Sequence, residues 1–221
     1  MPAVMDKHVT QKSFARPNSD GRRDQIVNAA LKVMIAEGVY GTTTRKIAEA
    51  AGVNVATLHY HFRDKEDILL QVMVKLVADY RALLARQFSR PQPLHDRIND
   101  LLQFIWGEIE KAPGEQLLLQ EMTLYVLRNP HVEQLALEKD KIFLSLYVDN
   151  LMTATDVSRE DAAFITGLAN FVYTSIIGIF NQWLATKDTP CLLNTLANLI
   201  GAAQEFAKRR QLSFAAPVEG E

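Results

Sequence analysis

Between Asn54 and His61 the chain carries more hydrogen-bonding side chains than a helix of that length usually shows. Amide, hydroxyl, imidazole and phenol groups can bind phosphate oxygens and the edges of bases in a DNA groove. A solvated helix with ordinary polar side chains would have a similar composition, so the neighbouring elements must decide between the two interpretations. The candidate contacts in this segment are Asn54, Ala56, Thr57, His59, Tyr60 and His61.

A short turn at Gly52 separates this segment from an earlier helical pattern. A helix enters the major groove when a second helix braces it at a steep angle, across a turn of three or four residues that often contains Gly. Thr43 is a suitable N-cap for the bracing helix, and Thr44 and Arg45 follow it. The pattern predicts a helix-turn-helix. Its inner face would be formed by Ile47, Ala48, Ala51, Leu58 and Phe62.

A third helix is expected to begin directly after Asp64, which can cap it. The N-terminus of a helix attracts anions, because its backbone N–H groups and its dipole both favour negative charge. Together with Lys65, this end of the helix would form a phosphate site. The predicted contact surface therefore extends beyond the second helix.

The segment TTTRKIAEAAGVNVATLHYHFRDKEDILL resembles the signature of the TetR-type family of ligand-responsive helix-turn-helix regulators. In this family an amphipathic helix precedes the motif, and here it would run from Arg22 to Glu37 and stop at Gly38. The resemblance implies a phosphate contact for Thr44, base or phosphate contacts for Arg45, groove contacts for Thr57 and Tyr60, and a backbone contact for Lys65.

The sequence departs from the family pattern at His59, where the family usually has Tyr. A phosphate contact survives that change. It could become pH-dependent, because an unperturbed His titrates near ~6.5.

Charge is distributed unevenly along the 221 residues, whose formal net charge is −2. Residues 1–75 hold 11 Lys and Arg against 8 Asp and Glu, whereas residues 76–221 hold 13 against 18. The positive charge thus lies with the helix-turn-helix. Because the excess of positive charge is small, we expect DNA binding to need two helix-turn-helix domains acting together and to weaken steeply as salt rises.

Residues 1–20 mix Pro, Ser, Asn and basic residues without periodicity. We expect a flexible arm, which would either follow a neighbouring groove or remain a solvated tail. The single Cys191 excludes an internal disulfide framework and fits a reducing cytoplasm. The basic side chains that such an arm could use are Lys12, Arg16, Arg22 and Arg23.

The sequence shows no catalytic or metal-binding constellation. His59 and His61 are two residues apart and would point about 200° apart on a helix, so they cannot chelate one metal ion. A Gly-rich phosphate loop, GxSxG and HExxH are all missing from the sequence. We therefore expect neither an enzyme nor a cofactor.

From Leu69 onward the periodicity is helical throughout, which predicts an all-α fold of about nine helices. Residues 21–67 would form the DNA-binding domain, and 68–221 would form an effector-binding and dimerisation domain. The later helices are predicted at Lys65 to about Phe88, Leu94–Lys111, Glu115–Leu127, a segment from after Pro130 to about Met152, Ala162–Thr186 behind a capping box at Ser158–Asp161, and a last helix opened by Thr189-Pro190.

The helix predicted at Ala162–Thr186 contains no charged residue, so length alone would allow a membrane span. Its amides, hydroxyls and two glycines favour a buried helix instead, and we expect no membrane partner. One face is bulky and suits the core of its own chain: Phe164, Leu168, Val172, Ile176, Ile179 and Trp183.

The opposite face of that helix is small and polar, which suits close approach of a symmetric copy. With the last helix it would form a four-helix bundle, and the family resemblance implies the same homodimer. The two helix-turn-helix domains could then bind half-sites about 34 Å or more apart. The predicted interface consists of Gly167, Asn170, Phe171, Thr174, Gly178 and Asn181, followed by Leu196, Leu199, Ile200 and Ala203.

Residues 68–221 form a larger part than DNA binding alone requires, and the resemblance implies that this part binds a small-molecule effector. Aromatic residues at helical spacing are also ordinary core, and Glu121 could equally be a solvated carboxylate. The candidate effector contacts are Trp106, Glu121, Met122, Tyr125, Phe143, Tyr147 and Tyr173.

These observations together predict a dimeric repressor that an unknown small molecule releases from double-stranded operator DNA. Two alternatives remain open. One is an architectural DNA-binding protein without an effector, and the other is a helical interaction or carrier protein.

Overall fold

The computed structural model describes residues 17–129 and 133–214, and within them every regular element is helical. The all-α prediction is confirmed. The elements are α1 (Pro17–Gly41), α2 (Thr44–Ala50), α3 (Val55–His61), α4 (Lys65–Gln87), α5 (Leu94–Lys111), α6 (Pro113–Leu127), α7 (Glu133–Leu151), the short 3-10 helix η2 (Arg159–Asp161), α8 (Ala162–Thr186) and α9 (Thr189–Phe214).

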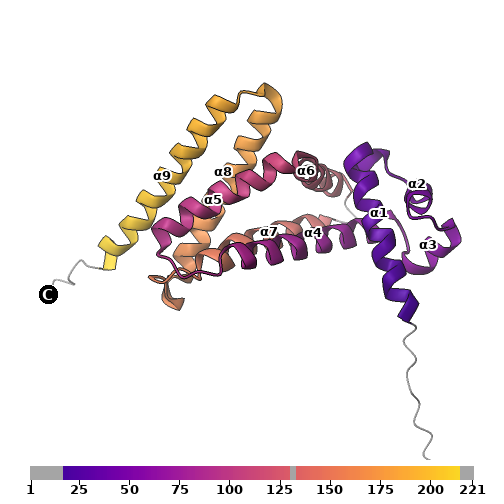
Figure 1. Ribbon diagram of the computed structural model, residues 1–221, viewed down its shortest axis with the longest axis horizontal. Helices are drawn as coiled ribbons and strands as arrows, with labels where there is room; N and C mark the ends of the chain where they lie inside the picture. The colour runs from indigo at the N-terminus through magenta and orange to yellow at the C-terminus, as the bar shows by residue number, and fades with distance from the viewer. Residues whose placement is uncertain (1–16, 130–132, 215–221) are drawn as a thin grey trace, which may run out of the picture.

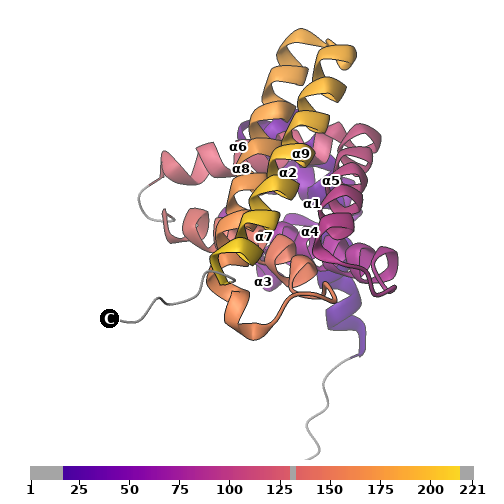
Figure 2. The ribbon, with the colours of Figure 1, turned by 90° about the vertical axis from the view of Figure 1, so that its left-hand side faces the viewer.

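The molecule is elongated, with α1, α2 and α3 grouped at one end (Figure 1). We call these three helices the head and the helices from α4 onward the body. Helices α4 and α7 extend from the head into the body, while α8 and α9 run side by side at the other end in both views (Figure 2). Helix α4 therefore spans the distance between the two parts of the molecule.

Gly38 interrupts α1, as the sequence predicts, with φ 74° and ψ 167°. Such a left-handed φ is open to glycine at little cost. The helix begins earlier than expected, at Pro17, so residues 17–20 belong to α1 rather than to the predicted arm. Lys12 and Arg16, two basic residues of that arm, lie outside the described residues.

Side-chain caps fix where the short helices of the head begin. The Thr43 hydroxyl accepts from the N–H of Lys46 at 3.3 Å, and the Asn54 amide oxygen accepts from the N–H of Thr57 at 2.7 Å. Asp64 caps α4 by accepting from the N–H of Asp67 at 2.8 Å. Each cap supplies an acceptor to a backbone donor that has no partner within its helix.

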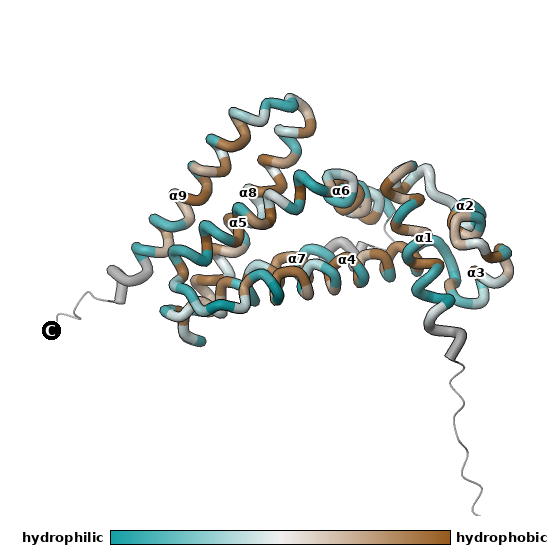
Figure 3. Tube along the Cα trace, viewed as in Figure 1, coloured by the Kyte–Doolittle hydropathy of each residue, from teal (hydrophilic) through white to brown (hydrophobic). Residues whose placement is uncertain are grey.

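Helix α8 buries only one side of its surface within the protein. Among the described residues, the stretch Arg159–Thr186 is long and apolar enough to cross a membrane, with 44% of its most apolar window buried. The predicted bulky stripe faces the core: Leu168, Val172, Ile176 and Ile179 are buried, and Phe164 and Trp183 pack against them. Hydrophobic positions recur along α8 and α9 between hydrophilic ones (Figure 3).

The end of α4 is held by a buried guanidinium. Arg97 on α5 is 1% exposed and donates to the carbonyls of Phe88 at 3.2 Å and Arg90 at 3.1 Å. Those carbonyls lie where α4 ends, and the guanidinium also lies 5.3 Å from the centre of the Phe88 ring. The contact fixes the turn between α4 and α5, because charge-assisted hydrogen bonds are the stronger kind.

Candidate functional site

Helices α2 and α3 form the predicted helix-turn-helix around a closed apolar interior. Ile47, Ala48, Leu58 and Phe62 are each at most 1% exposed. Gly52 occupies the turn with φ 63°, a conformation that other L-residues rarely adopt. The interior fixes the angle between the helices, so their outer faces form a rigid surface.

Helix α1 braces this pair from behind through two side chains. The Arg23 guanidinium lies 4.5 Å from the centre of the Phe62 ring and donates to the carbonyl of His61 at 3.1 Å. Gln25 donates to the carbonyl of Ala51 at 2.6 Å. Arg23, an expected DNA-arm residue, therefore supports the end of α3 in this structure.

The outer face of α3 carries the predicted contact residues into solvent. Tyr60 is 80% exposed, and its ring meets that of His61 edge to face at 5.1 Å. His59 is exposed beside it. The other predicted residues divide into exposed ones (Thr43, Arg45, Asn54 and Ala56) and half-buried ones (Thr44, Thr57 and His61).

Lys65 lies differently from the expectation that it reaches a phosphate. Its Nζ donates to the carbonyl of Val39 at 2.5 Å and lies 4.9 Å from the centre of the Tyr125 ring. Burial lowers its pKa, and the neighbouring Glu66 opposes that effect. The ammonium therefore joins α4 to the end of α1, because a local acceptor satisfies it inside the protein.

Helix α6 meets the same point from the body. The Glu121 carboxylate accepts from the N–H of Val39 at 2.8 Å, so both backbone groups of this buried residue are bound by side chains of other helices. Tyr125 donates to Glu66 at 2.5 Å, and its ring meets that of Tyr40 edge to face at 5.2 Å. We call these contacts around Val39 the joint between head and body.

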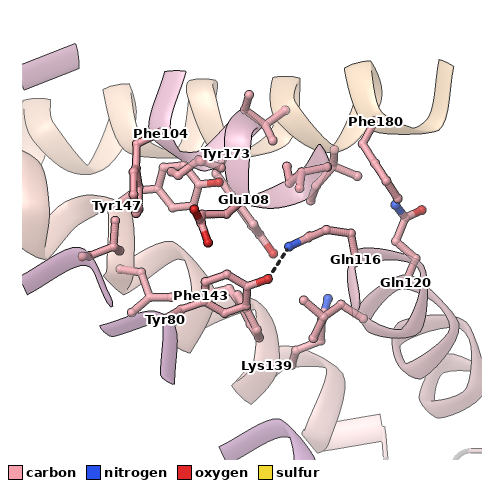
Figure 4. Close-up of a pocket in the computed structure, with 17 residues that line it drawn as sticks. Tyr80, Phe104, Glu108, Gln116, Gln120, Lys139, Phe143, Tyr147, Tyr173 and Phe180 are labelled. Carbon is pink, nitrogen blue, oxygen red and sulfur yellow. Dashed lines mark hydrogen bonds between the residues drawn. The ribbon is translucent and has the colours of Figure 1, made fainter. Parts of the chain in front are cut away.

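A pocket lies in the body between α4, α5, α6, α7 and α8 and encloses about 770 Å³, including the part open to solvent. Ten of its lining residues are apolar. Figure 4 shows the labelled side chains that enter it from these helices. The polar members of the lining are Tyr80, Glu108, Gln116, Gln120, Lys139, Tyr147 and Tyr173.

Three predicted effector residues line this pocket: Phe143, Tyr147 and Tyr173. The other four predicted residues do not belong to its lining. Trp106 and Met122 are 3% exposed and lie in the core, where the rings of Trp106 and Trp183 pack edge to face at 5.6 Å. Glu121 and Tyr125 belong to the joint, because their side of α6 faces α1 and α4.

Sequence reasoning missed the pocket residues Tyr80, Glu108, Gln116 and Lys139. Tyr80 accepts from Gln116 at 2.9 Å (Figure 4). It also donates to Glu115 at 3.3 Å. The sequence places Tyr80 and Glu108 in two separate helical segments. It does not indicate that both line one pocket, because that depends on how α4 and α5 cross.

Burial raises the pKa of the phenols in the pocket well above the usual range. For Tyr147 the main cause is desolvation. For Tyr80 and Tyr173 the carboxylates of Glu115 and Asp140 add to it. These hydroxyls stay neutral near neutral pH, so they act as hydrogen-bond donors and acceptors rather than as charges.

The predicted dimer face is divided by the structure. The six α8 residues from Gly167 to Asn181 that were assigned to it are all exposed in the single chain. The α9 residues assigned to it pack into the core of the single chain, where each is at most 8% exposed: Leu196, Leu199, Ile200 and Ala203. Leu193 and Phe206 flank this buried stripe on α9 and are 51% and 46% exposed, and the ring of Phe206 stacks on that of Phe164 of α8 at 5.2 Å.

Residues 26–72 match the family model described as bacterial regulatory proteins of the tetR family. This range covers most of the head and the start of α4. The match agrees with the resemblance found on the helix-turn-helix segment. The matched range includes α3, whose exposed outer face carries Tyr60 and His59.

Two curated relatives match most of the chain, at sequence identities of 21% and 26%. The HTH-type nicotine-responsive transcriptional repressor HdnoR of Paenarthrobacter nicotinovorans is 21% identical over 82% of this chain and 93% of its own length. The HTH-type transcriptional repressor BepR of Brucella suis biovar 1 is 26% identical over 73% of this chain and 80% of its own.

A solved structure shares the fold of both head and body. The fatty acid degradation regulator FadR from Bacillus halodurans superposes with a TM-score of 0.63 at 18% identity, covering 83% of this chain and 94% of that one. The family match over the head, the similarity to transcriptional repressors over most of the chain and the shared fold together support a DNA-binding transcriptional regulator of the TetR type.

Proposed function

We propose that the protein acts as a homodimer that binds a palindromic operator with two heads and leaves it when an effector fills the pocket. The DNA-binding domain would comprise residues 21–67, and residues 68–221 would bind the effector and the second chain. We assign no catalytic step to the chain.

The observation that carries the DNA part is the outer face of α3. Tyr60 is 80% exposed, so most of this large side chain, with both an apolar ring and a hydroxyl group, is available to a partner. We assign base contacts to Thr57 and Tyr60, and phosphate contacts to Thr44, Arg45 and His59. Lys65 would act indirectly, by holding the head in place through Val39.

The α8 face supports the dimer. A side chain on Gly167 or Gly178 would meet no heavy atom of the same chain within 4 Å, so another helix can approach closely there. Phe171, 41% exposed, would gain burial in such a contact. We place Leu193 and Phe206 of α9 at the edge of the same interface, in place of the buried α9 residues predicted from the sequence.

Helix α4 links the two sites. Lys65 at its first turn contacts the end of α1, and Tyr80, roughly 22 Å further along the helix, lines the pocket. An effector that moves Tyr80 would tilt α4 and change the spacing of the two heads. A coupling free energy of about 1–3 kcal/mol is enough for regulation of this kind.

The test is selection of duplexes from a random-sequence pool, followed by fluorescence anisotropy at several salt concentrations. We expect the selected sites to be palindromic, with affinity that falls steeply as salt rises. Thr57→Ala should change the selected half-site sequence. Arg45→Ala should weaken binding to all duplexes alike.

Lys32→Ala, a change of a basic residue on the part of α1 before the kink, serves as the control for loss of positive charge within the head. A chain that selects no sequence at low salt would refute the proposal. Selected sites without palindromic symmetry would refute the dimeric arrangement.

A further inference from the structure

We propose that the pocket of the body binds an organic cation, namely an apolar or aromatic molecule that carries one protonated amine beside Glu108. This inference rests on the proposed function, because it takes the pocket to be the effector site. It adds the chemical class of the ligand.

Most of the pocket wall requires an apolar ligand body. The wall includes Leu84, Ile105, Ile109, Ile176 and Ile177, which come from three helices. Such a surface gains free energy when it covers hydrocarbon and loses it when it desolvates polar groups without partners. A small sugar or a free phosphate would leave this wall without a suitable contact.

Of the two charged side chains in the lining, Lys139 directs its ammonium group to a residue outside the lining. Its Nζ donates at 2.6 Å to the hydroxyl of Thr123, which is not a lining residue, and lies 5.7 Å from the centre of the Phe143 ring. Burial also lowers its pKa, since desolvation disfavours the ammonium form. Lys139 therefore offers its hydrocarbon stem to the pocket.

Glu108 has one oxygen available to a ligand. Its Oε1 pairs with Lys111 at 2.6 Å, and no hydrogen bond to Oε2 occurs within the described part of the chain. Lys111 is 72% exposed and does not line the pocket. An exposed ion pair of this kind contributes little, about 0–1 kcal/mol, so a ligand amine can compete for the carboxylate.

Aromatic rings surround the same space. The Tyr147 and Tyr173 ring centres are 5.4 Å apart, and those of Tyr80 and Phe143 are 6.5 Å apart. The faces of such rings attract cations and repel anions. A ligand carboxylate would meet these faces and Glu108 together, so the pocket favours positive charge.

The test compares three probes of one shape by isothermal titration calorimetry on the full chain: 4-phenylbutylamine, 4-phenylbutanol and 4-phenylbutyrate. We expect the amine to bind about tenfold or more tightly than either of the others, since charge-assisted hydrogen bonds are roughly twice as strong as neutral ones. Glu108→Gln, a near-isosteric change, should remove the preference for the amine and leave the affinity for the alcohol unchanged.

Two further variants test the role of Glu108: one should increase the affinity for the amine, and the other should leave all three affinities unchanged. Lys111→Met should increase affinity for the amine about two- to fivefold, because it removes the competing cation at the cost of a weak pair. Glu110→Gln, an exposed carboxylate two residues further along α5, should bind all three probes as the parent does. Thermal melts of each variant check that the fold is intact.

Tightest binding of 4-phenylbutyrate, equal binding of all three probes, no binding of any probe, or an amine preference that survives Glu108→Gln would each overturn the inference. Operator binding is measured separately, on the same samples. A chain that prefers the amine but binds no selected duplex would refute the proposed function alone. A chain that binds operator but prefers the carboxylate would refute the ligand class alone.

Discussion

The head and the body of this protein place their functional groups in opposite ways. The head closes its interior completely and presents its polar side chains on the outer face of α3, where Tyr60 is 80% exposed. The body keeps its polar side chains inside a pocket, where Tyr147 is 8% exposed. An outer face can be formed by one short stretch of chain, whereas the pocket needs residues from five helices. The contrast separates a surface for a large partner from an interior for a small one.

The largest expected effect comes from Gly178→Arg on the exposed face of α8. We expect a folded monomer, because a β-carbon at this position would meet no heavy atom of its own chain within 4 Å, while the long side chain would block a second helix. Operator affinity should fall about a hundredfold or more, since one head alone loses the benefit of linked binding. Analytical ultracentrifugation and anisotropy measure the two results.

Gly107→Arg on α5 is the control, because a β-carbon there would likewise meet no heavy atom within 4 Å, and this half-buried glycine lies outside α8 and α9. It should remain dimeric. If Gly178→Arg stayed a dimer with parental affinity for the operator, the interface would have to lie on another face of the body.

A smaller effect is expected at the joint, where head and body are not independent. Glu121→Leu should lower the free energy of unfolding by about 1–3 kcal/mol, because it leaves the buried N–H of Val39 without its acceptor. Urea denaturation measures this change. The variant should also respond less to effector in the anisotropy assay, since α6 no longer holds the end of α1.

Glu110→Leu, an exposed substitution on α5, should change the free energy of unfolding by about 0.5 kcal/mol at most. Equal losses for the two variants would mean that the Glu121 contact adds nothing to the joint.

The smallest expected effect is a pH dependence of the free energy of unfolding, which comes from Tyr125 at the joint. Burial and the hydrogen bond to Glu66 raise the pKa of Tyr125 to about 12, whereas an unfolded tyrosine ionises near about 10. Because the folded pKa is the higher one, this contribution to stability is complete below about pH 10 and is lost as the pH rises toward about 12. Urea midpoints measured across this interval should therefore fall.

Tyr125→Phe removes one of the phenols responsible and should make that fall less steep. Identical slopes for the parent and the variant would contradict the assignment of Tyr125 to this pH range. The phenolate absorbance, followed in parallel, reports the ionisation directly.

The helix-turn-helix of the head could be predicted from the sequence, because its determinants are local. Thr43 and Asp64 cap the helices that they precede, as predicted, and each cap spans only three residues. Asn54, predicted as a DNA contact, caps α3 in the same way. The same holds for the ends of the body helices, which caps, prolines and glycines also mark. The all-α fold and the family could therefore be predicted from the order of residues alone.

The pocket and the joint could not be predicted in this way, because they depend on how distant helices cross. Glu121 and Val39 are 82 residues apart, and nothing near either residue indicates the hydrogen bond between them. Helix α9 shows a related difficulty. Its apolar face is broad, so periodicity alone could not distinguish the buried Leu196 at its centre from the exposed Phe206 at its edge.

The close approach of Gly38 to Glu121 limits which substitutions the chain accepts together. A methyl group on Gly38 would lie 2.8 Å from Glu121 Oε2, and the φ of 74° would strain any other L-residue there. A shorter residue at position 121 would relieve the collision but not the strain, and it would give up the acceptor for Val39. The two sites are therefore expected to show epistasis, in which the cost of each replacement depends on the other, although they belong to different parts of the molecule.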